Sequence, residues 1–275
     1  MIDAGLRALF EREHIFSIGV LPFSECRVTN ARLYESIGFL PQSALVFLIP
    51  YFSVQPDNFS AYAAAEDYHF YAKELYARME AELKHLYPDG DFLCFSDHSP
   101  IDEVSAAVCA GLGVFGKNRL FISKEYGTYQ FIGEFLSTLP PDAFGEATVF
   151  PPLTCIGCDA CLRACPTGIL RNESDVCLSA ITQRKGELSA EESALMRKVN
   201  TAWGCDECQR VCPYNKEAFH RGTAFTEIPF FKENLITHLD TRTVEEMPKE
   251  VFSRRAFAWR GQKTVLRNTR ILEEK

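Results

Sequence analysis

Residues 155–166 read CIGCDACLRACP, and residues 205–213 read CDECQRVCP. The first stretch has the C-x2-C-x2-C-x3-C-P spacing of bacterial ferredoxins, and the second repeats this spacing without its first cysteine. Eight of the eleven cysteines of the chain lie between Cys155 and Cys212, and Cys177 lies between the two stretches. The spacing and the count predict two iron–sulfur clusters, and therefore a protein that transfers electrons.

These cysteines can be divided between two [4Fe-4S] clusters with none left over. In this motif three thiolates surround one cluster, and the cysteine before proline binds the neighbouring cluster. A disulfide framework is typical of smaller secreted chains, and two structural zinc ions favour separate C-x2-C pairs without the cysteine–proline pairs. The predicted ligands are Cys155, Cys158, Cys161 and Cys212 for cluster 1, and Cys165, Cys177, Cys205 and Cys208 for cluster 2.

The composition is typical of a globular chain with room for one large and one smaller domain. It has 275 residues, of which 47% are hydrophobic and 12% aromatic. Charged residues interrupt the first twenty positions, so no secretory signal is expected. The longest apolar stretch, residues 44–52, is too short to span a bilayer, so no membrane partner is expected. A reducing, cytoplasmic location follows, in which Cys26, Cys94 and Cys109 are expected to be small apolar core residues.

The charge pattern leaves two readings of the C-terminal segment. The net charge of −8 argues against a generally basic surface for nucleic acid. Six basic residues nevertheless lie within seventeen positions, and they form either a local phosphate-binding patch or an ordinary solvated surface. They are Arg254, Arg255, Arg260, Lys263, Arg267 and Arg270.

The hydrophobic pattern predicts an α+β chain whose composition changes near residue 151. Strands are predicted at Ser43–Ile49, Phe92–Phe95, Leu120–Ser123 and Tyr129–Phe135. A long helix is predicted from Ala61 to Leu86, with His69 on its apolar stripe, where a hydrogen-bonded core histidine is the commoner role and a ligand or acid–base role the rarer one. A helical link is predicted at Ser189–Val199, and an irregular tail from Phe219 onward. The expected domains are residues 1–150, residues 151–218, and residues 219–275 packing back on the first.

Residues 111–116 read GLGVFG and fit the G-x-G-x-x-G fingerprint of dinucleotide sites. That fingerprint functions when a strand precedes it and a helix follows, which brings the pyrophosphate to the helix N-terminus. Here residues 103–110 are predicted to be a helix and residues 119–123 a strand, so the order is reversed. The glycines are therefore expected to end a helix in a close turn, and a nicotinamide site is rejected.

Several short stretches together resemble one family. Residues 96–100 read SDHSP, residues 110–118 read AGLGVFGKN, and residues 126–129 read YGTY. Further matches are DYH at 67–69, TG at 167–168, GCD at 204–206, WRG at 259–261 and RN at 267–268, in addition to the cysteines. The chain resembles the epoxyqueuosine reductases over nearly its whole length.

The resemblance implies a fold and an activity. The fold is a nitroreductase-like, cobalamin-binding catalytic domain followed by a double-cluster ferredoxin-like domain. The activity is removal of the epoxide oxygen of epoxyqueuosine in a tRNA anticodon loop, with electrons passing from the two [4Fe-4S] clusters to cobalamin and supplied by an external low-potential donor. The chain has no D-x-H-x-x-G motif, as is usual in this family.

The resemblance also assigns residues. Asp97 is the implied proton donor, a role that needs a raised carboxyl pKa; without the resemblance, an N-cap is the expected role for this aspartate. Arg27 or Arg32 is a weaker candidate for contact with a corrin side chain. The implied cobalamin contacts are Ser60, His69, Asp97, Lys117, Asn118, Phe121 and Ile132.

The chain departs from the family pattern in two places. Residues 60–66 read SAYAAAE and lack the usual polar pair and glycine before DYH. The sequence also stops at Lys275, before the HEAT-like repeats of longer members, which weakens the tRNA assignment more than the redox assignment. Two alternatives therefore stay open: a related corrinoid reductase acting on a small molecule, similar to the reductive dehalogenases, and an electron-transfer protein. The second is less favoured, because an electron carrier needs no 150-residue upstream domain.

Overall fold

The computed structural model describes residues 2–274, which divide into two compact units whose segments alternate along the chain. Unit 1 comprises the residues up to Tyr51 together with Ala72–Gly157 and Glu217–Ile228. Unit 2 comprises Phe52–Tyr71, Cys158–Lys216 and the residues from Pro229 onward. The domain limits expected from the sequence, 1–150, 151–218 and 219–275, stay a prediction.

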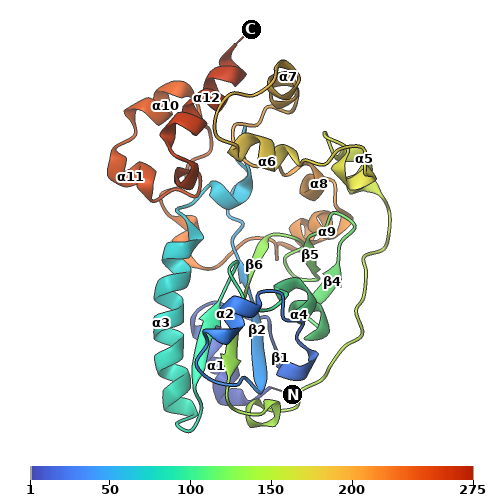
Figure 1. The fold of residues 1–275 in the computed structure, drawn as a ribbon, viewed down its shortest axis with the longest axis vertical. Helices are drawn as coiled ribbons and strands as arrows, with labels where there is room; N and C mark the ends of the chain where they lie inside the picture. Colours follow the sequence, from blue (N-terminus) through green and yellow to red (C-terminus); the bar gives the residue numbers. More distant parts are fainter. Residues whose placement is uncertain (1, 275) are drawn as a thin grey trace. The chain divides into compact units, whose positions relative to one another are not determined.

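Unit 1 is built on a four-stranded antiparallel sheet with the strand order β1-β2-β6-β3, of which β1, β2 and β6 are labelled in Figure 1. β2 lies between β1 and β6 and is buried along its whole length, which explains its almost continuous apolar sequence. The strands are Ile18–Pro22 (β1), Ser43–Pro50 (β2), Phe92–Phe95 (β3) and Gln130–Ser137 (β6).

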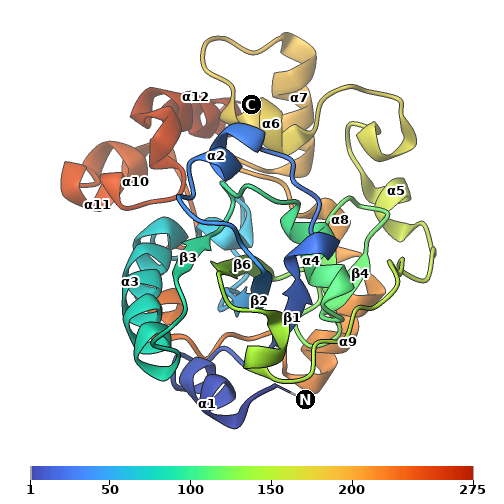
Figure 2. The ribbon, with the colours of Figure 1, turned by 60° about the horizontal axis from the view of Figure 1, so that its bottom comes forward.

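One face of this sheet is covered by α1 (Ala4–Arg12) and α3 (Tyr68–Leu86), whose first turn belongs to unit 2 (Figure 2). The ring of Phe47 on β2 lies 5.1 Å from that of Phe10 on α1 and 6.4 Å from that of Tyr76 on α3, measured between ring centroids. Large aromatic side chains therefore fill the layer between the sheet and these two helices.

The opposite face is covered by α4 (Glu103–Cys109), with the short α2 (Ala31–Glu35) beside it. Val46 and Leu48 of β2 belong to the same buried cluster as Ala107 of α4. Because successive side chains of a strand point to opposite faces, β2 supplies apolar residues to both layers. The small side chains of α4 allow this helix to approach the sheet closely.

The glycine-rich stretch follows α4 directly. A two-stranded sheet pairs β4 (Gly113–Phe115) with β5 (Phe121–Ser123), so a helix precedes the glycines and a strand follows them. The order predicted from the sequence is confirmed, and it is the reverse of the order in a dinucleotide-binding turn.

Unit 2 is mainly helical and contains two buried clusters. One is centred on Trp203 and Phe257 and packs against α10 (Thr241–Glu246), α11 (Lys249–Ser253) and α12 (Gln262–Glu273). The other joins α12 to α6 and α7. The remaining helices are α5 (Ala160–Ala164), α6 (Leu178–Gln183), α7 (Ala190–Val199), α8 (Glu207–Arg210) and α9 (Pro213–Arg221), whose C-terminal part belongs to unit 1.

The expected α+β class is confirmed. The four predicted strands agree with the structure to within two residues at each end, and the helix predicted at Ser189–Val199 is α7, with Ser189 as its N-cap. The predicted start of the long helix at Ala61 is wrong, because α3 begins at Tyr68. The prediction of an irregular tail is also wrong, because the tail contains three α-helices. None of the helices within residues 2–274 combines the length and the apolar character that a membrane span requires.

Candidate iron–sulfur and carboxylate sites

The glycine-rich turn of unit 1 holds the first predicted cluster ligand. Residues 153–155 run beside β4: the Phe115 N–H donates to the Leu153 carbonyl at 2.8 Å, and the Cys155 N–H donates to the Phe115 carbonyl at 2.9 Å. The backbone N–H of Lys117 then donates to Cys155 Sγ at 3.4 Å. Such N–H groups stabilise a thiolate and influence the potential of a cluster bound to it.

Close packing explains one glycine of this turn. A Cβ added at Gly113 would lie 2.2 Å from the Ile122 carbonyl oxygen, a backbone atom that cannot move aside. Glycine therefore allows β4 to lie close against β5 while its other edge binds the segment that carries Cys155. The motif that resembles a nucleotide site therefore lies beside Cys155, a predicted cluster ligand.

The other cysteines of the first motif lie on and beside a short helix in unit 2. Cys161 and Cys165 are buried at α5, whereas Cys158 is exposed before it. Burial raises the pKa of the Cys165 thiol, but backbone N–H groups of Leu170 and Gly168 and the Thr167 hydroxyl outweigh it, so the net pKa is lowered. A sulfur surrounded by donors is suited to the thiolate form that iron requires.

The second set of cysteines comes from three separate segments. Cys177 occupies the N-cap position of α6, and Cys208 lies on α8, which packs against α5. Burial raises the pKa of Cys205 to about 12, and burial also raises that of Cys208. The thiols of Cys205, Cys177 and Cys161 contribute electrostatically to the raised pKa of Cys208.

Ser60 anchors a loop next to these cysteines. Its hydroxyl donates to Asp206 Oδ1 at 2.5 Å, and the Ala61 N–H donates to Asp206 Oδ2 at 2.7 Å. Gln209 supplies a third donor to this buried carboxylate. The predicted contact of Ser60 with cobalamin is untested, and the bond to Asp206 gives its hydroxyl a structural partner. This loop also explains the late start of α3, because residue 61 is bound elsewhere.

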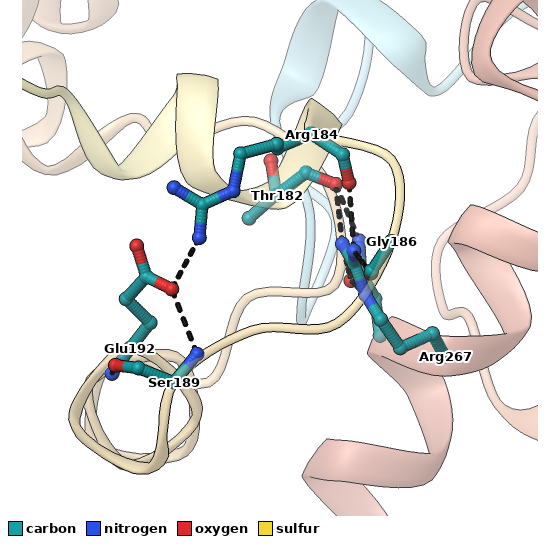
Figure 3. Close-up of polar contacts among 7 residues, drawn as sticks. Thr182, Arg184, Gly186, Ser189, Glu192 and Arg267 are labelled. Atoms are coloured by element: carbon teal, nitrogen blue, oxygen red, sulfur yellow. Dashed lines mark hydrogen bonds and ion pairs between the residues drawn. The ribbon is translucent and has the colours of Figure 1, made fainter.

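Arg267 and Asn268, which belong to the family pattern, bind the C-terminal end of α6 (Figure 3). The guanidinium of Arg267 donates to the carbonyls of Arg184, at 2.7 Å, and Gly186. The Asn268 amide donates to the Thr182 carbonyl at 2.7 Å and also to that of Ala202. The pair therefore satisfies carbonyls that a helix end leaves without intrahelical partners.

The C-terminal basic residues are largely engaged within unit 2. Arg254 pairs with Glu66, Arg270 pairs with Glu245, and Arg255 is buried. The guanidinium of Arg260 stacks 3.6 Å from the ring centroid of Trp259. The reading of the whole segment as a phosphate-binding patch is therefore weakened, because several of these cations already have partners.

Asp97 lies at the tip of a loop between β3 and α4. It is exposed and has a positive φ of 64°, which is uncommon for a residue with a side chain. Its backbone N–H donates to Glu103 Oε1 at 2.7 Å. The alternative reading of Asp97 as an N-cap is wrong, because Asp102 caps α4 by accepting from the Ser105 N–H. The carboxylate of Asp97 is thus held on a loop rather than used at a helix end.

Two carboxyl groups next to this loop, on β6 and α4, were not predicted from the sequence. Glu134 is fully buried on β6, and Glu103 is half-buried in the first turn of α4. A signal existed, since Glu134 is the only charged residue in the strand sequence QFIGEFLS. A charge in a strand that is otherwise apolar requires a partner or a proton.

The other predicted cofactor contacts have different environments. Lys117 and Asn118 share the turn beside Cys155, and the buried Asn118 amide nitrogen has no hydrogen-bond partner within the described chain. Phe121 is buried and Ile132 is half-buried at the α4 side of unit 1. Arg32 is exposed on α2.

His69 belongs to unit 2, and its place on an apolar stripe is a wrong prediction. Its side chain is 60% exposed, and Nδ1 lies 2.6 Å from Asp67 Oδ1. The error follows from the start of α3 at Tyr68, which places His69 in the first turn of the helix. The positions of these side chains do not test the roles assigned from the resemblance. The cofactor assignments therefore stay predictions.

The arrangement of the thiols is suited to a polynuclear cluster. Within residues 2–274, no three His, Cys, Asp or Glu side chains converge closely enough to bind a single metal ion. The ligands of a cubane need not converge in this way, because each sulfur binds a different iron of the cage.

Comparison with known proteins agrees with this site. Residues 154–215 match the family described as the 4Fe-4S double cluster binding domain. The chain is 35% identical over 214 residues to the epoxyqueuosine reductase of Listeria monocytogenes serovar 1/2a, with 75% of this chain and 54% of the relative covered. It is 33% identical over 210 residues to that of Bacillus subtilis strain 168, with coverage of 74% and 52%.

The fold also matches solved structures. A crystal structure of a selenomethionine-labeled epoxyqueuosine reductase has a TM-score of 0.77 and 25% identity, covering 96% of this chain and 80% of that one. A second structure, of an epoxyqueuosine reductase with an epoxyqueuosine-modified tRNA stem loop, has a TM-score of 0.76 and 24% identity, with the same coverage.

The cysteine-bearing segment and its match define a class, the proteins with a double [4Fe-4S] cluster domain attached to an α+β body. Within that class, the chain is similar to the epoxyqueuosine reductases. It spans about half the length of the curated relatives that it matches.

Proposed function

We propose that this chain is an oxidoreductase that removes the epoxide oxygen of epoxyqueuosine in tRNA to give queuosine. The observation that carries the proposal is the 35% identity to an epoxyqueuosine reductase over 214 residues, together with the match of residues 154–215 to the double cluster domain. A structural neighbour was solved with an epoxyqueuosine-modified tRNA stem loop, which supports the same substrate class.

The proposal assigns the eight thiolates to two clusters by their spacing. Cluster 1 takes the first three cysteines of the motif and the last cysteine before proline, and cluster 2 takes the remaining four. The electrostatic contacts of Cys208 with Cys205 and Cys177 support the second set. The clusters accept single electrons from an external low-potential donor and store them for a two-electron reduction.

Cobalamin is part of the proposal, and one feature of the turn beside Cys155 fits it. The buried Asn118 amide nitrogen has no partner within the described chain, so it is available to an acceptor such as a corrin amide side chain. Lys117, Phe121 and Ile132 would complete the contacts from unit 1. When bound, the cofactor supplies the strongly reducing, nucleophilic metal that epoxide opening requires.

The chemistry assigns a role to Asp97. Loss of the epoxide oxygen as water consumes two electrons and two protons, and it leaves a carbon–carbon double bond. A side chain that donates one of these protons must be exposed to substrate and must be held in place. Asp97 is exposed, and its backbone is anchored by Glu103. A neighbouring Bacillus subtilis structure has a catalytic aspartate loop swung out of the active site, which supports a proton donor on a loop in this fold.

The cellular setting follows from the substrate. Transfer RNA and a reducing medium, in which cysteines are kept as thiols, are both found in the cytoplasm, where we place the protein. The anticodon loop is the proposed tRNA contact, and phosphate binding to exposed cations such as Lys263 would contribute to its affinity.

The test uses the full chain, reconstituted anaerobically with iron, sulfide and cobalamin. Wild-type protein with a strong reductant should convert epoxyqueuosine-containing tRNA to queuosine-containing tRNA, measured by mass analysis of the nucleosides. Asp97→Asn should lower the rate by about a hundredfold or more, because an amide is not a general acid. Both clusters should remain, as shown by their absorbance.

Asp89→Asn is the matched control, since Asp89 is an exposed aspartate in the turn that precedes β3. It should react at the wild-type rate. Wild-type protein that binds cobalamin and leaves this tRNA unchanged would overturn the proposal, and it would favour the corrinoid reductase with a small-molecule substrate. Failure to bind cobalamin at all would favour the electron-transfer protein.

A further inference from the structure

The sheet of unit 1 contains a carboxyl group that is not exposed to solvent. Glu134 lies on β6, directly opposite Val46 of β2 and Phe95 of β3, and its exposed fraction is 0%. The Ser99 hydroxyl donates to its Oε1. Its Oε2 is buried and receives no N–H or O–H donor from the described chain. A carboxylate left in this state would carry a large desolvation penalty, so the group needs a proton or a cation.

The neighbour of Glu134 is a second carboxyl group, that of Glu103. The two side chains are within hydrogen-bonding reach of each other, which two ionised carboxylates would not tolerate. Burial raises the pKa of Glu134 well above its usual range, and burial raises that of Glu103 to about 7. The hydrogen bond between them lowers the pKa of Glu103 and raises that of Glu134, so Glu134 is the member that keeps the proton.

The other partner of Glu103 is the loop of the proposed proton donor. Its Oε1 accepts the backbone N–H of Asp97 at 2.7 Å. That residue has a positive φ of 64°, a conformation that needs support from its surroundings. Ser96, on the same loop, is tied to β6 by its hydroxyl, which donates to the Ile132 carbonyl at 2.7 Å.

We propose that Glu134 acts as a carboxylic acid that donates its proton to a hydrogen bond with the Glu103 carboxylate, and that Glu103 in turn positions the Asp97 loop. Glu103 and Glu134 are positioning residues, because neither is assigned a contact with substrate or cofactor. The role in turnover rests on the proposed function, whereas the protonated pair does not depend on it.

The ionisable groups that interact electrostatically with this pair come from several elements, and the following ones are acids. Asp97 and Asp102 raise the pKa of Glu103 from the loop and from the α4 cap. Three further groups have pKa values raised by burial, with Glu134 among the additional causes: Cys26, Cys94 of β3 and Tyr76 of α3. An acidic neighbourhood favours retention of the proton by the pair.

Infrared difference spectroscopy tests the protonated carboxyl group directly. The cluster-loaded wild-type chain should show the C=O stretch of a protonated carboxylic acid at pH 8, shifting upon exchange into deuterated water. The band should be absent from Glu134→Gln and present in Glu74→Gln, which alters an exposed glutamate of α3. A wild-type spectrum without this band, or an unchanged band in Glu134→Gln, would overturn the proposal whether or not the chain acts on tRNA.

Kinetics on the same proteins test the positioning role. Glutamine keeps a donor for Glu103 and an acceptor for Ser99, so Glu134→Gln should retain kcat within about twofold of wild type. Glu134→Leu removes the donor and should lower kcat by about tenfold or more with KM unchanged, because a displaced acid affects the chemical step. Equal kcat values in the two variants would contradict the positioning role. A chain that never reacts with this tRNA would refute the proposed function and leave the infrared result valid.

Discussion

At the scale of single residues, Cys177 is the predicted ligand that no local spacing identifies. It lies outside both cysteine motifs, at the N-cap of α6, and it contributes to the raised pKa of Cys205 and Cys208. We expect Cys177→Ser to lower the iron content from about eight to about four per chain, because cluster 2 loses a ligand while cluster 1 keeps all four. Iron and sulfide quantitation after anaerobic reconstitution measures this change.

The matched control is Cys109→Ser, which alters a half-buried thiol in unit 1 outside the motifs. It should keep about eight irons. A Cys177→Ser protein that still holds all its iron would show that the assignment of ligands by spacing is wrong.

The residues of the proposed sites differ in how well their roles can be predicted from the sequence. The cysteine motifs are local, since three ligands of a cluster lie within a few positions, so their role could be predicted from spacing alone. Glu103 and Glu134 meet only because β6 pairs with β3 and the chain returns through the 96–102 loop to α4. Nothing in their separation of thirty-one positions predicts that contact.

At the scale of elements, Arg267 is expected to fix the end of α6, which begins at the proposed ligand Cys177. Its planar guanidinium donates through Nη1 to the carbonyls of Arg184 and Gly186, and through Nε and Nη2 to Asn268 Oδ1, a fork that a lysine ammonium does not reproduce. We expect Arg267→Lys to destabilise unit 2 by about 1–3 kcal/mol, because the buried Asn268 amide oxygen loses donors. Faster hydrogen exchange in residues 182–188 and earlier loss of cluster absorbance in urea would show it.

Arg270→Lys, one turn further along α12, serves as the control. Arg270 pairs with Glu245, and both side chains are at least half exposed. Surface ion pairs contribute about 0–1 kcal/mol, so this variant should melt almost as wild type does. Equal destabilisation by both substitutions would mean that the fork at α6 has no special role.

The ends of helices and strands could be predicted where a local sequence pattern sets them. They could not be predicted where hydrogen bonds to distant residues set them. β3 matches its predicted range because its four consecutive apolar residues and the flanking turn residues are all nearby in sequence. The residues before α3 have a helical pattern, but the Ala61 N–H is bound by Asp206 and the Asp67 N–H by the Arg254 carbonyl. These two bonds are made with residues far along the chain, and they delay the helix to Tyr68.

At the scale of the whole molecule, two compact units are each assembled from three separated segments. Composition and spacing predicted that the chain contains an α+β body and a cluster-binding part. They could not predict that residues 217–228 return to unit 1, where the Arg221 and Thr223 side chains donate to carbonyls of Lys124 and Glu125. Such returns depend on contacts between distant segments, which no local pattern encodes.

The proton on Glu134 should affect how the free energy of unfolding depends on pH. The folded state keeps this proton because its pKa is raised well above the usual range, whereas the unfolded chain releases it near pH 4.3. Above about that pH the folded state holds more protons than the unfolded state, so this group reduces the free energy of unfolding as the pH rises. Glutamine at this position titrates in neither state and removes the effect.

We therefore expect the free energy of unfolding of Glu134→Gln, minus that of wild type, to increase by about 1.4 kcal/mol per pH unit between about pH 5.5 and pH 7.5. Urea unfolding followed by circular dichroism at several pH values measures this difference, and contributions from groups that do not interact with Glu134 cancel in the comparison. Glu74→Gln should run parallel to wild type over the same range, because this exposed side chain lies outside the Glu103–Glu134 pair. If the Glu134→Gln curve also ran parallel, Glu134 would be ionised in the folded chain, and Glu103 would then face a buried negative charge rather than a hydrogen-bond donor.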